Sequence, residues 1–256
     1  MRRGSIDLNA DVGEGCGFDE ELIPLVSSVN IACGAHAGGR EAMQAAVTLA
    51  VRHGAAIGAH PGFADRENFG RKEIPISPVA ASALVIGQLR VLAEVAGEAG
   101  ARVGHVKLHG ALYNMAARGG ALARAICEAI GAENRRGQER TLVALAGSGM
   151  ASVADALGLC VAREAFADRL YLGDGSLAPR SREGSVIEDP GHAAMQALGI
   201  VREGRVLDEA GSAVAVDADT ICIHGDRPGG AALALRIRQE LAASGIAIRR
   251  FGAGAA

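Results

Sequence analysis

The sequence Arg102-Val-Gly-His-Val-Lys-Leu-His-Gly-Ala-Leu-Tyr-Asn114 carries the clearest structural signal in the chain. Val106 and Leu108 suit the packed face of a strand in a parallel sheet, and His105, Lys107 and His109 alternate with them on the other face. A lysine and two histidines are costly to bury unless they bind something. The pattern therefore predicts an inner strand with one chemical face. A solvated edge strand is the alternative.

Composition sets the class of protein around this strand. The chain has 256 residues, of which 49% are hydrophobic and only 3% aromatic, so we expect one domain over 1–256 with an aliphatic core of Ala, Val, Leu and Ile. A formal net charge of −3 without a basic block argues against nucleic acid and anionic membranes as partners. The substrate is then expected to be small.

The cysteines and the apolar runs bear on the compartment. Five cysteines without a Cys-x-x-Cys pair argue against a disulfide framework and indicate a reducing environment. The chain shows neither an uninterrupted apolar run long enough to cross a membrane nor a signal-peptide core at its start. These features predict a cytoplasmic protein.

Strands and helices alternate about seven times along the chain. Strands are expected at 5–8, 29–32, 55–59, 102–109, 141–146, 160–164, 220–223 and 246–250. Helices are expected at 20–27, 40–53, 78–98, 121–132, 150–157, 192–203 and 231–243, with an irregular segment and a small hairpin at 172–187. This alternation predicts a single parallel (β/α) domain. A closed barrel is favoured over an open doubly wound sheet, because polar residues follow five different strands.

Chemistry-bearing side chains gather where the expected strands end. They are Asp11, Glu14, His36, His60, Lys107, His109, His224 and Asp226. In a barrel these positions meet at the carboxyl ends of the strands, where ligands bind. Helix capping by Asp11 and solvation of Glu14 are the ordinary alternatives for the first pair.

Two kinds of chemistry remain open from the residues alone. Asp with several His has the composition of a divalent metal site, for which Asp11, His36 and His60 are the possible ligands. In metal-free hydrolysis, Asp11 or Glu14 is the base, a histidine protonates the leaving nitrogen, and Lys107 stabilises negative charge. Asp168 and Arg169 are expected to pair with each other or to orient the substrate. Gly147-Ser148-Gly149 lacks the lysine of a P-loop and is more typical of a tight turn.

Several motifs together resemble the LamB/YcsF family over nearly the whole chain. They are Asp7-Leu-Asn-Ala-Asp-Val-Gly-Glu-Gly, Asn30-Ile-Ala-Cys-Gly-Ala-His-Ala-Gly, Ile57-Gly-Ala-His-Pro-Gly-Phe, His105-Val-Lys-Leu-His-Gly-Ala-Leu-Tyr-Asn, Phe166-Ala-Asp-Arg and Thr220-Ile-Cys-Ile-His-Gly-Asp. Three positions depart from the family pattern: Leu108 replaces a usual Pro, Ala35 a usual Phe, and Gly39 a usual Asp. The loss of a carboxylate at Gly39 weakens the expectation that the His36 loop binds metal or substrate.

The resemblance implies a seven-stranded (β/α) barrel, similar to carbohydrate deacetylases. It implies ATP-dependent opening of 5-oxo-L-proline to L-glutamate together with 5-oxoprolinase subunits B and C. Since no nucleotide motif occurs here, ATP is expected to be bound mainly by those partners. We predict catalytic roles for Asp11, Glu14, Lys107 and His109, and substrate-binding roles for His36, His60, Arg71, Asn114, Asp168, His224 and Asp226.

Three further possibilities stay open at this stage. The first alternative function is a metal-dependent deacetylase of an N-acetylated sugar, and the second is a scaffold that binds the lactam without transforming it. Whether the chain forms a homo-oligomer is also left open.

Overall fold

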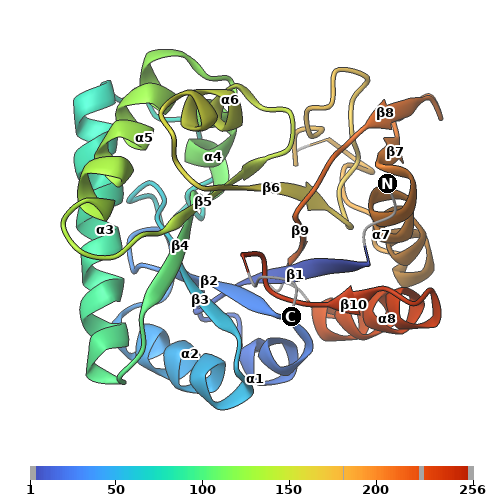
Figure 1. Cartoon of the computed structure of the whole chain (residues 1–256), viewed down its shortest axis with the longest axis horizontal. Coiled ribbons are helices and arrows are strands. Elements are labelled where there is room, and N and C mark those ends of the chain that lie inside the picture. Colours follow the sequence, from blue (N-terminus) through green and yellow to red (C-terminus); the bar gives the residue numbers. More distant parts are fainter. Residues whose placement is uncertain (1–3, 181, 225–227, 253–256) are drawn as a thin grey trace.

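Parallel strands follow one another around a closed ring in the order β1, β2, β3, β4, β5, β6 and β9 (Figure 1). We analysed a computed structural model, which describes residues 4–180, 182–224 and 228–252. The strands of the ring are β1 (Ser5–Val12), β2 (Ser28–Ala32), β3 (Ala56–His60), β4 (Val103–Lys107), β5 (Thr141–Leu145), β6 (Val161–Phe166) and β9 (Thr220–His224). Pairing of β9 with β1 closes the barrel, which confirms the predicted seven-stranded architecture. Because β4 lies between β3 and β5, the edge-strand alternative is excluded.

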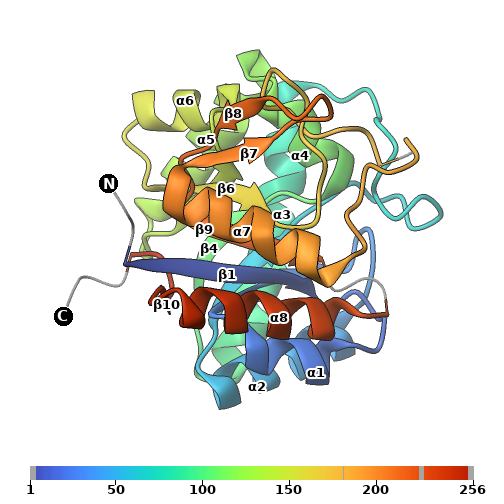
Figure 2. The same cartoon turned by 90° about the vertical axis from the view of Figure 1, so that its right-hand side faces the viewer.

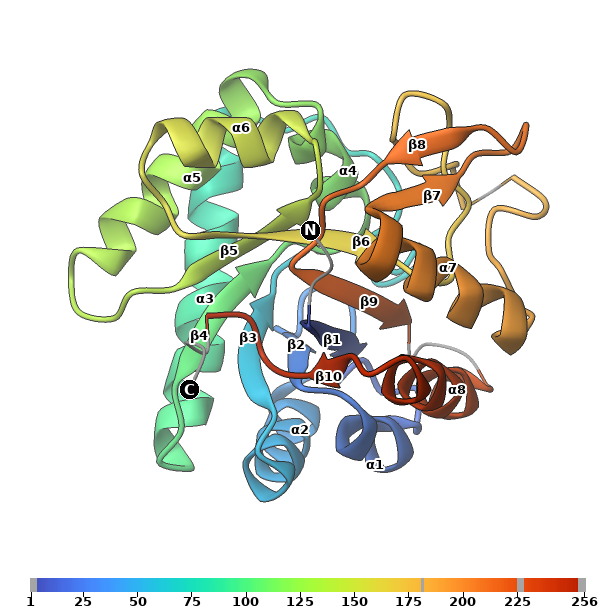
Figure 3. The same ribbon diagram turned by 45° about the vertical axis from the view of Figure 1, so that its right-hand side comes forward.

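Helices lie on the outside of the ring (Figures 1 and 3). They are α1 (Asp19–Leu22), α2 (Arg40–His53), α3 (Pro78–Glu98), α4 (Gly110–Ala117), α5 (Gly120–Asn134), α6 (Gly149–Ala156), α7 (Pro190–Glu203) and α8 (Gly230–Ala243), and a 3₁₀ turn (Ile23–Leu25) follows α1. Local chemistry sets the ends of several helices. The Ser77 side chain accepts a hydrogen bond from Ala80 N–H at the start of α3, and Gly54 ends α2 in the left-handed conformation.

The aliphatic core lies between the strands and the helices, whereas the inside of the barrel is polar. Val106 and Leu108 are at most 1% exposed and belong to the aliphatic cluster, as the alternation predicted. Inside the ring, Asn9, Asn30 and Glu164 are buried and hydrogen-bonded to one another. The core is mainly aliphatic, as the composition predicted, and the polar side chains inside the ring occupy the inward positions of alternating strand residues.

Three elements differ from the sequence expectation. β1 continues to Val12 instead of ending at Leu8, because its polar residues face a polar interior and only resemble a loop. α4 follows β4 directly and was not predicted. The antiparallel hairpin of β7 (Arg205–Leu207) and β8 (Ala213–Ala215) was not predicted (Figure 2). The segment 172–187 is irregular as expected, and a tight turn at its start is closed by an antiparallel bridge between Tyr171 and Leu177. The final strand, β10 (Ala247–Ile248), pairs with the start of β1 outside the ring.

One helix has the length and apolar composition of a membrane span. This helix is α3 (Pro78–Glu98), and it is the single helix of this kind among the described residues. It packs along α5 and α2 as one of the helices of the barrel (Figure 1). Its buried residues repeat at helical spacing, from Ala81 through Val85 and Leu89 to Leu92.

Candidate active site

A network of polar side chains fills the barrel interior beneath the site. Asn9 Nδ2 donates to Glu164 Oε1 at 3.0 Å and to Thr220 Oγ1 at 2.7 Å. Asn30 Nδ2 donates to Asn9 Oδ1 at 2.7 Å, and His105 Nε2 lies 2.9 Å from Asn30 Oδ1. Each side chain has a partner from another strand, so the network fixes the strands relative to one another.

Lys107 connects this network to the site. Its Nζ lies 2.9 Å from Asp11 Oδ1, 2.8 Å from Glu164 Oε1 and 3.0 Å from Cys222 Sγ, and the residue is only 2% exposed. Burial lowers the pKa of Lys107, but the Asp11 carboxylate and the other buried partners outweigh it and hold the pKa well above its usual value. Burial likewise raises the pKa of Asp11, and His60 with Lys107 reverses this, so that its pKa lies well below normal. Both groups are charged at neutral pH.

Three imidazoles gather above Lys107. His36, His60 and His109 are all at most 4% exposed, and the rings of His36 and His109 stack with centroids 3.8 Å apart. Two carboxylates border them: Asp11 Oδ2 is 3.2 Å from His60 Nε2, and Glu14 Oε1 is 3.6 Å from His109 Nδ1. Burial lowers the pKa of His36 to about 3 and holds that of His109 well below normal. Both rings are therefore neutral at physiological pH.

Glycines in the loop after β3 make room for the imidazoles. A Cβ added at Gly62 would lie 2.9 Å from His36 Nδ1 and 3.0 Å from His109 Cβ. A Cβ at Gly70, whose φ is +62°, would lie 2.9 Å from His36 Cβ. Glycine is needed at these positions because the loop backbone lies directly against the rings.

His224 and Asp168 form a second pair on the other side of Asp11. His224 Nδ1 lies 2.8 Å from Asp168 Oδ2, and the register of β1 and β9 places Asp11 opposite His224. The sequence left open whether Asp168 pairs with Arg169. The structure gives Asp168 a histidine as partner, while Arg169 donates to the carbonyl oxygens of Ser185 and Ala178.

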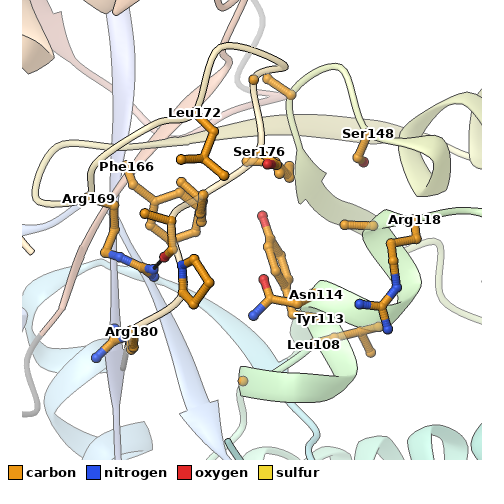
Figure 4. Close-up of a pocket in the computed structure, with 18 of the residues that line it drawn as sticks. Leu108, Tyr113, Asn114, Arg118, Ser148, Phe166, Arg169, Leu172, Ser176 and Arg180 are labelled. Carbon is orange, nitrogen blue, oxygen red and sulfur yellow. Dashed lines mark hydrogen bonds between the residues drawn. The ribbon is translucent and has the colours of Figure 1, made fainter. Parts of the chain in front are cut away.

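A cavity of about 1030 Å³ opens above these groups. Its walls include Asp11, Glu14, His60, Arg71, Lys107, His109, Tyr113, Asn114, Arg118, Ser148, Phe166, Arg169, Ser176, Arg180 and His224. Tyr113 and Asn114 point into the cavity from α4, between Arg169 and Arg180 on one side and Arg118 on the other (Figure 4). The cavity therefore combines a carboxylate and imidazole floor with cationic walls.

The structure brings most of the predicted site residues together. Asp11, Glu14, His60, Lys107, His109, Asn114 and His224 line the cavity, and His36 lies directly behind His109. Arg71 is exposed at the rim, with its guanidinium 4.7 Å from the Phe69 ring centroid. Asp226 lies outside the described residues. Ser148 caps α6 after a tight turn at Gly147, as its sequence context favoured.

Sequence reasoning missed two residues of the site, Glu164 and Arg180. Glu164 is fully buried and accepts from Tyr113 Oη at 2.8 Å and from Lys107. Glu164 and Ala165 are neighbours in β6 and point to opposite faces of the strand, so the pattern allowed an inward glutamate. A single charged residue in a strand is nevertheless a weak signal of a functional site. Arg180 falls in the irregular segment, where no periodicity places a side chain.

Groups of side chains within the described residues have the composition and spacing to hold a metal ion. They are Asp11 with His60 and His109, Glu14 with His36 and His109, and Asp11 with Cys222 and His224. The set expected from sequence, Asp11 with His36 and His60, is thus divided between two groups that share His109.

Comparison with known proteins places this architecture in a family. The LamB/YcsF family profile matches residues 6–255. The chain belongs to the LamB/YcsF family. Similar relatives include the A subunit of 5-oxoprolinase from Bordetella parapertussis, 47% identical over 250 residues that cover 96% of this chain and 98% of the relative. The same-named protein of Heliobacterium modesticaldum is 46% identical over 249 residues, with 95% and 97% covered.

Solved structures agree with this family membership. The crystal structure of a lactam utilization protein from Thermus thermophilus is 44% identical, covers 96% of this chain and is itself covered completely, with a TM-score of 0.88. A structure described as T48 deacetylase with substrate matches with a TM-score of 0.51 at 13% identity, over 95% of this chain and 86% of the other. At that identity the likeness extends to the fold alone.

Two of the three departures from the LamB/YcsF pattern, Leu108 and Gly39, have a local structural consequence. Leu108 is 1% exposed, packs in the aliphatic cluster and also lines the cavity (Figure 4). Gly39 is the residue before α2, where it supplies no side-chain cap. Leu108 therefore changes packing beside the cavity, whereas Gly39 changes the end of a helix.

Proposed function

We propose that this chain is the barrel subunit of an ATP-hydrolysing 5-oxoprolinase and opens the lactam ring of 5-oxo-L-proline. The observation that carries the proposal is the floor of the cavity, where ionised Asp11, the neutral imidazole of His109 and Glu14 converge on one volume. Relatives with 5-oxoprolinase names and a lactam utilization protein of the same fold support the substrate class. The remote deacetylase likeness adds no support for sugar deacetylation, because it is limited to the fold.

The positions of the side chains suggest a role for each in ring opening. Glu14 borders the imidazoles within the cavity and is placed to take a proton from the attacking water. The protonated Glu14 can then return that proton to the ring nitrogen as the C–N bond breaks, while His109, which is neutral and directs its Nε2 proton to the carbonyl oxygen of Phe69, lines the same floor. Lys107 lines the same floor, and its charge, shared with Asp11 and Glu164, offsets negative charge that develops on the carbonyl oxygen.

The cationic wall suits the carboxylate of the substrate. Arg169 is buried and Arg180 is half-buried on the same side of the cavity (Figure 4). A guanidinium can bind a carboxylate through two parallel hydrogen bonds, which would orient the ring with its amide toward the floor. We assign Arg180 to this role, and Arg71 at the rim remains a second candidate.

ATP and partner subunits account for the remaining chemistry. Amide resonance stabilises the lactam, and phosphorylation of its carbonyl oxygen makes the carbon easier to attack. The cavity is larger than a small cyclic amino acid needs, since cavities of several hundred Å³ already hold drug-sized ligands. We propose that B and C subunits supply most of the ATP-binding groups, and that the complex is cytoplasmic. Five cysteines in the free thiol state are compatible with a reducing compartment.

Reconstitution tests this function directly. ADP and glutamate should form from ATP and 5-oxo-L-proline when the chain is mixed with the B and C subunits, and Glu14→Gln should lower that rate by ~10²-fold or more. Full ATP-coupled turnover by the chain alone would refute the partner requirement. Absence of glutamate from a complex that assembles stoichiometrically would refute the lactam assignment.

A further inference from the structure

Two histidines on the cavity floor, His60 and His109, direct a ring nitrogen toward each other, and neither of these nitrogens carries a proton when the rings are neutral. His60 Nδ1 lies 2.9 Å from the carbonyl oxygen of Lys107, and His109 Nε2 lies 2.8 Å from the carbonyl oxygen of Phe69. A carbonyl oxygen only accepts, so each of these ring nitrogens must carry the proton. The remaining nitrogens, His60 Nε2 and His109 Nδ1, then hold lone pairs when the rings are neutral, and they lie 2.9 Å apart.

Two lone pairs at this separation repel unless a cation lies between them. A shared proton is one solution, and a metal ion is the other. Asp11 Oδ2 lies 3.2 Å from His60 Nε2, and the ligand atoms of Asp11, His60 and His109 all lie within 4.8 Å of one another. The backbone carbonyls that orient both rings are the outer partners that metal-binding histidines usually have.

We propose that His60 Nε2, His109 Nδ1 and Asp11 Oδ2 bind one divalent transition-metal ion. Two imidazoles and a carboxylate suit zinc and its neighbours better than magnesium or calcium, and three protein ligands leave a position open toward the cavity. With bonds of about 2.1 Å and tetrahedral angles, the two nitrogens would lie roughly 3.4 Å apart, so the rings must separate by about half an ångström.

The surroundings of the triad favour a metal over a shared proton. His36 is 1% exposed, and neither of its ring nitrogens has a hydrogen-bond partner within the described structure. Its Nε2 lies 3.5 Å from Glu14 Oε1, and Glu14 in turn borders His109 Nδ1. An unpartnered buried imidazole is costly. A water on the open metal position, shared by Glu14 and His36, would satisfy it, and the metal would make that water more acidic.

Metal binding can be tested on the isolated chain without substrate, so its failure leaves the lactam proposal standing. The protein is treated with chelator, dialysed and titrated with Zn²⁺ by calorimetry and with Co²⁺ by visible absorption. We expect one ion per chain and Co²⁺ d–d bands of a low-coordinate nitrogen and oxygen site. His109→Gln should weaken affinity more than ~100-fold, beyond the loss caused by removing an outer partner.

Two control variants define the ligand set. His53→Asn removes an exposed histidine from the end of α2 and should leave binding unchanged, which controls for adventitious surface sites. Cys222→Ser tests the competing group of Asp11, Cys222 and His224. A thiolate charge-transfer band that disappears in Cys222→Ser would overturn the assignment. Failure of the folded wild-type chain to bind Zn²⁺ or Co²⁺ at micromolar concentration would also overturn it. A proton shared between His60 Nε2 and His109 Nδ1 would then account for their short separation.

Discussion

Replacing Lys107 with Met distinguishes the contribution of the Lys107 ion pairs to stability from a contribution of Lys107 to turnover. The change keeps the stem of the side chain and removes the ammonium group that contacts Asp11 and Glu164. The carboxylates of Asp11 and Glu164, residues that are at most 7% exposed, then lose their cationic partner. Breaking a buried pair in this way costs about 3–5 kcal/mol. For a domain of this size, that cost corresponds to a fall in Tm of roughly 10 °C.

Circular dichroism melting of the isolated chain measures this loss, and reconstituted turnover is measured on the same preparation. Lys72→Met is the matched control, because Lys72 is the other lysine of the chain and is exposed. Adding Glu164→Gln to Lys107→Met neutralises one orphaned carboxylate and should recover part of the lost stability. A Lys107→Met protein that melts within about 2 °C of wild type would refute the pairing argument, and normal turnover would remove Lys107 from the site.

Three further changes follow from particular contacts. Gly62→Ala forces a Cβ against His36 and His109 and should cost about 1–3 kcal/mol, whereas Gly87→Ala in open space on α3 should raise Tm slightly; equal melting temperatures would contradict this account. Gly39→Asp adds an N-cap to α2 and should stabilise by a few tenths of a kcal/mol, and a lower Tm in thermal melting would count against it. Burial raises the pKa of Asp7 from 3.8 to about 6, so its contribution to stability is complete below pH 3.8 and is lost as the pH rises through 6. Asp7→Asn should therefore remove up to about 3 kcal/mol of the decline in stability as the pH rises from below 3.8 to above 6, and melting curves from pH 3.5 to 7 that keep the wild-type slope would refute this.

The sequence by itself determined the alternation of strands and helices and the face on which the chemistry lies. Period-two alternation in β4 separated Val106 and Leu108 from Lys107, because neighbouring side chains of a strand point to opposite faces. Glycine and proline marked the ends of α2 and α3 for similarly local reasons. The positions of Asp11, His60 and His109 after strands were enough to predict a common site once a barrel was assumed.

Only the tertiary structure decided which groups pair. Lys107 contacts Glu164 on a strand two positions around the ring, and no local pattern encodes that distance. Asn9 to Val12 resembled a loop because the polar interior that these residues face is built by six other strands. The orientation of His60 and His109 depends on carbonyl groups of Lys107 and Phe69, which belong to separate segments. Period and propensity act over a few residues, whereas charge pairing and histidine orientation depend on atoms that only the closed barrel brings within hydrogen-bond distance.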